Sequence, residues 1–148
     1  MNNFMKLALI EARNSGRDVP VGAVIVKNGE IIAQAHNQKE ELNDVTAHAE
    51  ILALKEAERK LGEWRLEGCK LYVTLEPCPM CASAIINARM SEVYYGAADS
   101  LYGAFGGALD LRKTFNSKLK VVGGIMEKEC AELLKNFWRE NGKSKKQV

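Results

Sequence analysis

A six-residue stretch, Glu76 to Cys81, carries two cysteines three positions apart and strongly constrains the fold. It follows the apolar run 71–75, which is typical of a buried strand, and precedes residues 82–86, which are typical of a helix. Because residues three apart share one face of a helix, both sulfurs can reach one metal ion. A redox Cys-x-x-Cys pair has the same strand-to-helix setting. The stretch alone therefore predicts a strand–helix junction with either a metal site or a redox pair.

Length and composition are those of an ordinary globular protein. The chain has 148 residues, 47% apolar and 27% charged, and we expect a single domain spanning 1–148. No apolar run reaches membrane-spanning length and the first residues do not resemble a signal peptide, so we expect a cytoplasmic protein without membrane contact. In that reducing compartment the cysteines favour metal binding or catalysis over disulfides. Cys69 and Cys130 stand alone in the sequence and are expected to be buried thiols.

The net charge of +2 is unevenly distributed along the chain. From Lys135 onward there are five basic residues and one acidic residue, a net charge of +4, which leaves −2 for the remainder. Such a block is either a phosphate-binding extension or a solvated end, and charge alone favours the solvated end. The other basic residues of the block are Arg139, Lys143, Lys145 and Lys146.

The first third of the chain has helix and hairpin signals. Apolar residues at helical spacing predict an amphipathic helix over 3–14. Two apolar runs, 21–26 and 31–35, flank an Asn-Gly pair, which is the strongest short-range signal for a two-residue hairpin turn. The polar segment 36–44 is too long for a tight turn and is expected to form a loop.

A second helix is predicted to start at Thr46 or Ala47 and to end near residue 61. In a regular helix His48 and Glu50 would point to nearly opposite faces, because two residues subtend about 200°. Both side chains line one pocket only if His48 lies in an irregular first turn. Otherwise His48 is a packing residue at the helix terminus, and Glu50 is a first-turn carboxylate favoured by the helix dipole.

Helices and strands also alternate after the cysteines. Residues 80–90 are expected to complete a helix, 93–95 and 119–125 to form strands, and 127–140 to form a final amphipathic helix. The Gly- and Ala-rich residues 97–107 predict a mobile loop near the strand ends. This alternation implies an α/β fold in which a mixed sheet carries helices on both faces.

Two motifs together decide between the metal site and the redox pair. A His-Ala-Glu motif at 48–50 precedes a Pro-Cys-Pro-Met-Cys motif at 77–81, and 27 residues separate Glu50 from Cys78. This is the His-x-Glu…Pro-Cys-x-x-Cys signature of zinc-dependent nucleobase deaminases. A redox pair would leave the first motif without a role. The chain is identified as a member of these deaminases, with one zinc ion held by His48, Cys78 and Cys81.

Longer stretches resemble the bacterial tRNA-specific adenosine deaminases over nearly the whole chain. The resemblance implies a three-layer α/β/α fold with a mixed five-stranded sheet, a homodimer and one zinc ion per subunit. It also implies conversion of adenosine to inosine at the wobble position (34) of the arginine tRNA with anticodon ACG. The alternatives are a deaminase of a free base or nucleotide (guanine, cytosine, dCMP) and a zinc-stabilised RNA-binding subunit without catalysis, which the presence of Glu50 does not favour. The resembling stretches are 18–26, 46–51, 71–78, 95–97 and 137–139.

The chemistry of such sites gives Glu50 a defined role. Zinc held by one imidazole and two thiolates keeps a fourth position for water and makes hydroxide available near neutral pH. Hydroxide is expected to attack C6 of adenine. Glu50, which does not bind the metal, is expected to carry the water proton to N1 and later to protonate the departing ammonia.

The resemblance implies several substrate-binding residues around the zinc. Asn37 lies 11 positions before His48, where members of the family place an asparagine that hydrogen-bonds the flipped base. Val21 and Leu75 are implied as apolar walls of the base pocket, and Ala47 as a further substrate contact. Without the resemblance, Asn37 would be interpreted as an ordinary loop residue.

RNA contacts are implied at two further places. Asp99 matches an acidic residue of a loop that meets the anticodon backbone and sugar. Members of the family often carry a lysine two positions later, whereas this chain has Leu101, and the next residue, Tyr102, offers a stacking surface instead. With an RNA substrate, the basic tail becomes a candidate contact to phosphates, and solvated lysines are the alternative. The candidate tail contacts are Arg139, Lys143, Lys145 and Lys146.

Overall fold

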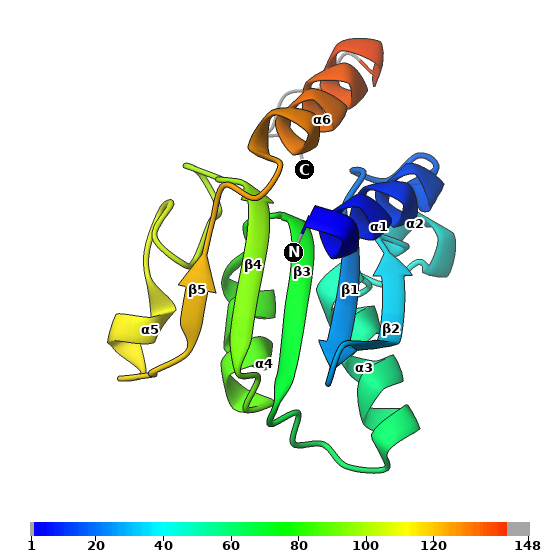
Figure 1. Ribbon diagram of the computed structural model, residues 1–148. Helices are drawn as coiled ribbons and strands as arrows, with labels where there is room; N and C mark the ends of the chain where they lie inside the picture. Colours follow the sequence, from blue (N-terminus) through cyan, green and yellow to red (C-terminus); the bar gives the residue numbers. More distant parts are fainter. Residues whose placement is uncertain (1, 142–148) are drawn as a thin grey trace.

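The computed structural model describes residues 2–141 and contains a five-stranded sheet with helices on both faces (Figure 1). The strands are β1 (Gly22–Lys27), β2 (Glu30–His36), β3 (Cys69–Leu75), β4 (Glu92–Ala97) and β5 (Lys120–Val122). Their order across the sheet is β2-β1-β3-β4-β5. β1 pairs antiparallel with β2 and β3, whereas β3, β4 and β5 are parallel. The expected α/β fold with a mixed five-stranded sheet is confirmed.

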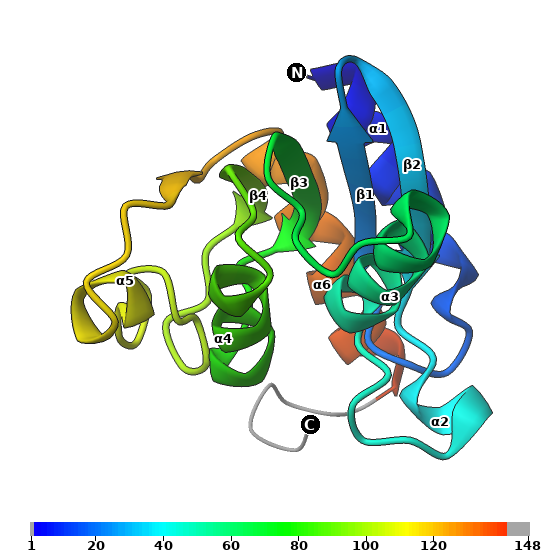
Figure 2. The ribbon, with the colours of Figure 1, turned by 90° about the horizontal axis from the view of Figure 1, so that it is seen from below.

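Four long helices form the outer layers. On one face lie α1 (Asn2–Ala12), which continues into a 3-10 turn at Arg13–Ser15, and α6 (Glu127–Asn141). On the other face lie α3 (Ala49–Leu61) and α4 (Pro79–Asn87), side by side in Figure 2. Within the described residues, no helix has the length and apolar character needed to cross a membrane.

The alternation of side chains along β1 connects the two outer layers. Ile25 belongs to the apolar cluster under α3 and α4, whereas its neighbour Val24 belongs to the cluster under α1 and α6. Because successive side chains of a strand point to opposite faces, a strand covered on both sides is apolar throughout. This explains why β1 appears in the sequence as an unbroken hydrophobic run.

The hairpin between β1 and β2 has the predicted turn. Asn28 and Gly29 adopt φ angles of 52° and 79°, both in the left-handed region that a type I′ turn requires. Asparagine and glycine tolerate this region better than other residues do. The Asn-Gly pair therefore fixes the pairing next to the turn, and the register of the two strands shifts between Val26 and Ile25.

Several short elements and boundaries differ from the sequence expectations. The polar segment after β2 contains a single-turn helix, α2 (Lys39–Leu42), and another, α5 (Leu111–Thr114), follows the Gly-rich loop. At α5 the Asp110 side chain accepts a hydrogen bond from the backbone N–H of Arg112, as an N-cap does. β5 ends at Val122 rather than near residue 125, and two glycines follow it. Such short elements carry too few residues to produce a detectable periodicity.

Gly22 allows α1 to pack directly on β1, and its replacement tests that contact. A Cβ atom at this position would lie 1.9 Å from the Ala8 carbonyl oxygen and 2.6 Å from the Ala12 nitrogen. We expect Gly22→Ala to lower the free energy of unfolding by about 3 kcal/mol, because backbone atoms must move apart. Gly62→Ala, at a left-handed φ of 66° with open space around it, should cost only about 1 kcal/mol. Urea denaturation distinguishes the two, and equal losses would contradict the close packing of α1.

Candidate active site

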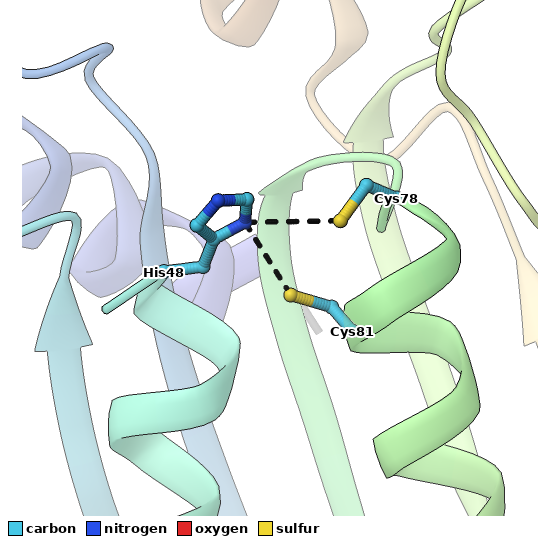
Figure 3. Close-up of side chains that lie close together, drawn as sticks. All are labelled: His48, Cys78 and Cys81. Atoms are coloured by element: carbon cyan, nitrogen blue, oxygen red, sulfur yellow. Dashed lines mark hydrogen bonds between the residues drawn. The ribbon is translucent and has the colours of Figure 1, made fainter. Parts of the chain in front are cut away.

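Three metal-ligating side chains meet where α3 and α4 begin, at the carboxyl end of β3 (Figure 3). His48 is the residue before α3, Cys78 is the residue before α4, and Cys81 lies in the first turn of α4. Pro79 occupies the first turn of α4, where its missing N–H has no intrahelical partner to lose. Ligands of open α/β sheets bind at this edge, outside the carboxyl ends of the strands.

The backbone at the start of α3 resolves the conflict between His48 and Glu50. His48 has extended dihedral angles (φ −76°, ψ 151°), and the helix begins only at Ala49. Glu50 is then the second helical residue, and both side chains line the same cavity. The irregular first turn that the site requires is confirmed. The helix starts later than Thr46 or Ala47, because Val45 and Thr46 form a turn and His48 is extended.

Asn37 caps α3 from outside the helix. The His48 side chain forms no capping hydrogen bond. Instead, Oδ1 of Asn37 accepts a hydrogen bond of 2.8 Å from the backbone N–H of Ala49, and Nδ2 donates one of 2.9 Å to the Val19 carbonyl. A single carboxamide thus ties the segment before β1 and the end of β2 to the first turn of α3. Because the Gln38 N–H also donates to the Ala47 carbonyl, the backbone is held on both sides of His48.

The three ligand atoms have the spacing that a tetrahedral zinc ion requires. Nδ1 of His48 lies 3.7 Å from Sγ of Cys78 and 3.5 Å from Sγ of Cys81 (Figure 3). With ordinary Zn–N and Zn–S bond lengths, a tetrahedral angle places nitrogen and sulfur ligands about 3.6 Å apart. All three atoms lie within 4.8 Å of one another. One imidazole and two thiolates form a donor set typical of zinc and leave a fourth position open.

The two cysteines and the histidine shift one another's pKa values. A hydrogen bond with Cys81, with a further contribution from His48, lowers the pKa of Cys78 to about 4. The same interaction, together with burial, raises the pKa of Cys81. The hydrogen bond to Cys78 raises the pKa of His48. The three groups thus share protons in the space that a cation would occupy, so metal binding would displace those protons.

Glu50 is a buried carboxyl group beside the three ligands. It is 4% exposed, and burial is the main reason that its pKa is raised to about 7. The negative charge on Cys78 raises this pKa further, whereas His48 lowers it. A carboxyl group with a pKa near neutrality can both accept and donate a proton at physiological pH.

A cavity opens at the ligand cluster, and most of the predicted substrate residues line it. Val21, Asn37, Leu75 and Asp99 belong to its wall, together with His48, Glu50 and Cys78. Ala47 is fully buried and does not belong to the lining, and Arg139 is exposed on α6 outside it. Lys143, Lys145 and Lys146 lie outside the described residues.

The cavity wall also contains residues that the sequence did not single out. α6 contributes Leu134 and Trp138, so the C-terminal helix forms one side of the cavity. The aromatic pair at 137–138 was visible in the sequence, but periodicity does not tell which element an apolar face will cover. Lys39 adds a cation at the rim, and Asp18, Val19 and Glu76 complete the wall together with Tyr102, which the sequence analysis names as a stacking surface. Of these, Glu76 had a usable signal, since it is an acidic residue between a buried strand and a zinc ligand.

Replacing Glu50 with glutamine should stabilise the metal-free protein at alkaline pH. Below its ordinary pKa of 4.5 the Glu50 carboxyl is protonated whether the chain is folded or unfolded, so replacement has little effect. Between pH 4.5 and about 7 the folded chain retains a proton that the unfolded chain loses, and the stability contributed by this group falls. Glu50→Gln should therefore raise the free energy of unfolding at pH 8 by about 3 kcal/mol relative to wild type.

Urea denaturation in the presence of EDTA measures this effect at pH 5, 6, 7 and 8. Glu30→Gln, at the exposed hairpin turn, removes the same charge away from the site and should change stability by less than about 0.5 kcal/mol at each pH. A Glu50→Gln effect independent of pH would contradict the raised pKa.

Comparisons with known proteins agree with this geometry. The family model described as the cytidine and deoxycytidylate deaminase zinc-binding region matches residues 1–97. The tRNA-specific adenosine deaminase of Bacillus subtilis (strain 168) is 48% identical over 147 residues, which cover 97% of this chain and 91% of the relative.

Solved structures agree as well. One from a study of A-to-I editing by tRNA:A34 deaminases at the wobble position of transfer RNA has a TM-score of 0.83 and 47% identity, and the match covers 90% of this chain and 100% of the other. A guanine deaminase from Bacillus subtilis has a TM-score of 0.63 and 38% identity, and the match covers 80% of this chain and 69% of the other. The chain therefore belongs to the zinc-dependent tRNA-specific adenosine deaminases, within the cytidine and deoxycytidylate deaminase family.

Proposed function

We propose that this protein converts adenosine to inosine, with release of ammonia, at the wobble position (34) of the arginine tRNA with anticodon ACG. The observation that carries the proposal is the cavity in which Glu50 lies beside the His48, Cys78 and Cys81 ligand set. The relatives named as tRNA-specific adenosine deaminases support adenosine in tRNA as the substrate. One zinc ion per subunit completes the site.

Glu50 is the proton carrier of the proposed reaction. Bound zinc supplies Lewis acidity that makes hydroxide available near neutral pH. Glu50 takes a proton from the attacking water and delivers it to N1 of adenine. It then takes the proton of the hydroxyl newly added at C6 and passes it to the amino group, which leaves as ammonia. Burial of the Glu50 side chain keeps bulk water from competing for the proton.

The cavity wall supplies the contacts to the base. Val21 and Leu75 offer apolar surfaces for a flipped adenine ring. Nδ2 of Asn37 carries two hydrogens, of which one is directed to the Val19 carbonyl, and the second is assigned to the base. Asn37 therefore both caps α3 and binds substrate. Ala47 supports the pocket through its backbone, since its carbonyl accepts a hydrogen bond from Gln38.

Contacts to the rest of the anticodon loop are assigned to the rim. Asp99 and Tyr102 on one side and Trp138 of α6 on the other are polar and aromatic groups suited to sugars and unstacked bases. The basic segment from Arg139 onward is assigned to RNA phosphates. We further propose that the chain forms one domain over residues 1–148, acts as a homodimer, and works in the cytoplasm, where its tRNA substrate is.

A three-part assay separates this function from its competitors. The zinc-loaded protein is incubated with an unmodified anticodon stem-loop bearing ACG and, in parallel, with free guanine, cytosine and dCMP, and inosine and ammonia are measured. Inosine from the stem-loop alone supports the tRNA deaminase. Ammonia from the small molecules alone would instead support a free-base or nucleotide deaminase. The structural similarity to a guanine deaminase is the observation that favours this alternative. Stem-loop binding without product would support an RNA-binding subunit.

Replacing Glu50 with alanine should abolish turnover and leave the zinc site intact. General acid–base catalysis contributes on the order of 10²–10⁴-fold, so we expect kcat to fall by a factor in about this range. Glu56→Ala, on the same helix but outside the cavity lining, should retain wild-type turnover. Zinc content by metal analysis and circular dichroism verify that both variants are loaded and folded. Appreciable inosine formation by loaded Glu50→Ala would overturn the role of this carboxylate.

Deleting residues 143–148 should weaken RNA binding and make it less sensitive to salt. The deletion removes three lysines, and each phosphate contact on a single strand contributes about 0.7 to the slope of log affinity against log salt concentration. We therefore expect the slope to fall by about 2. Replacing Lys27, Lys60 and Lys118 with glutamine removes the same charge far from the cavity and should leave the slope nearly unchanged. Equal effects of deletion and control would show that the tail is only solvated.

A further inference from the structure

A buried carboxylate that the proposed chemistry does not use holds the loop after β4. Glu76 follows β3 directly, two residues before Cys78, and is 2% exposed. Its Oε1 accepts a hydrogen bond of 2.9 Å from the backbone N–H of Asp99. Its Oε2 accepts two more, from the N–H groups of Phe105 at 3.0 Å and Gly107 at 2.8 Å. In the described part of the chain no basic side chain forms a salt bridge with Glu76, so these three donors offset its burial.

The backbone on either side of this carboxylate holds the same loop, residues 99–107. The N–H of Glu76 donates to the Ala97 carbonyl at 2.8 Å, and the carbonyl of Pro77 accepts from the N–H of Ala104 at 2.9 Å. The loop runs from the end of β4 toward α5 in Figure 1. Glu76 and Pro77, which lead into Cys78, therefore hold the loop by hydrogen bonds at its start (Asp99), its middle (Ala104 and Phe105) and its end (Gly107).

Two glycines of the 99–107 loop are required by close packing on the carboxylate. A Cβ atom at Gly103 would lie 2.3 Å from Cδ of Glu76. A Cβ atom at Gly107 would lie 2.1 Å from the Asp99 carbonyl oxygen and 2.6 Å from Oε1 of Glu76. The sequence predicted a mobile loop from its glycine content. The contacts instead assign these glycines to a close approach between loop and carboxylate.

The 99–107 loop forms part of the cavity wall. Oδ1 of Asp99 accepts hydrogen bonds of 3.0 Å from the N–H groups of Leu101 and Tyr102, which shapes the first turn of the loop. Asp99 and Tyr102 line the same cavity as Glu50. Glu76 thus links the segment that carries the zinc ligands to a wall that faces the substrate.

We propose that Glu76 is a positioning residue that fixes the 99–107 loop as the surface on which the polynucleotide rests, and so controls substrate affinity rather than the chemical step. Its two oxygens are already engaged by backbone N–H groups, which makes it unsuited to carry protons during turnover. This inference rests on the proposed function, because the loop is assigned to a nucleic-acid substrate. The positioning itself rests only on the hydrogen bonds and contacts around Glu76.

Two variants test the proposal from opposite sides of the contact. Glu76→Gln keeps the shape of the side chain but turns an NH₂ group toward backbone donors. Gly107→Ala keeps Glu76 and pushes the loop away from it. For both variants, we expect KM for the ACG stem-loop to rise by about tenfold and kcat to stay within about twofold of wild type. A tenfold change in affinity corresponds to the loss of one buried hydrogen bond to a charged group. Amide hydrogen exchange at residues 99, 105 and 107 should accelerate, and zinc content should be unchanged.

Glu30→Gln is the matched control, because it removes one exposed charge at the start of β2, beside the hairpin turn, and should change neither KM nor exchange. A fall in kcat at unchanged KM in zinc-loaded Glu76→Gln would overturn the proposal, since it would place Glu76 in the chemistry. Faster exchange without a change in KM would overturn it too, because the loop would then not support the substrate. Zinc loss in Glu76→Gln with wild-type behaviour of Gly107→Ala would assign Glu76 to the metal site instead.

If wild-type protein forms no inosine, the proposed function fails, and stem-loop binding affinity together with exchange decides the role of Glu76.

Discussion

The convergence of two helix N-termini at the carboxyl end of β3 is the constraint on which the rest of the site depends. β3 is central, with β1 antiparallel on one side and β4 parallel on the other, so the helices after β2 and β3 begin at the same edge of the sheet. The N–H groups and dipoles of both helix starts favour anionic ligands there. A histidine held in extended conformation before one helix and a cysteine before the other then need no further distortion to reach one metal ion.

This convergence opposes folding in the absence of metal. Two thiol groups, an imidazole and a carboxyl group lie together, partly or fully buried, and burial together with the charge on Cys78 raises the pKa of Glu50 to about 7. A cation at the ligand cluster would favour the ionised forms of all the acids around it. Metal binding and stability are thereby linked, and the groups that make the site reactive are the ones that destabilise it when it is empty.

Much of the framework was predictable because the signals are local. The hairpin followed from Asn28-Gly29, the buried strands from apolar runs, and the ligand set from two motifs at the mouths of helices. The delayed start of α3 depends instead on Asn37, whose carboxamide reaches Ala49 across 12 positions. The presence of Trp138 in the cavity depends on how α6 packs against β3 and β4. Both are long-range tertiary effects that propensity and periodicity do not contain.

The two buried glutamates of the site show why burial alone does not identify a proton carrier. Glu50 and Glu76 are 4% and 2% exposed, and both border the cavity. Glu76 accepts three backbone N–H groups, so its lone pairs are engaged in holding a loop. Glu50 faces the thiols and the imidazole, and burial shifts its pKa into the range where a proton can be taken up and released. The identity of the hydrogen-bond donors around each carboxylate, rather than its depth, separates a group that moves protons from one that positions the chain.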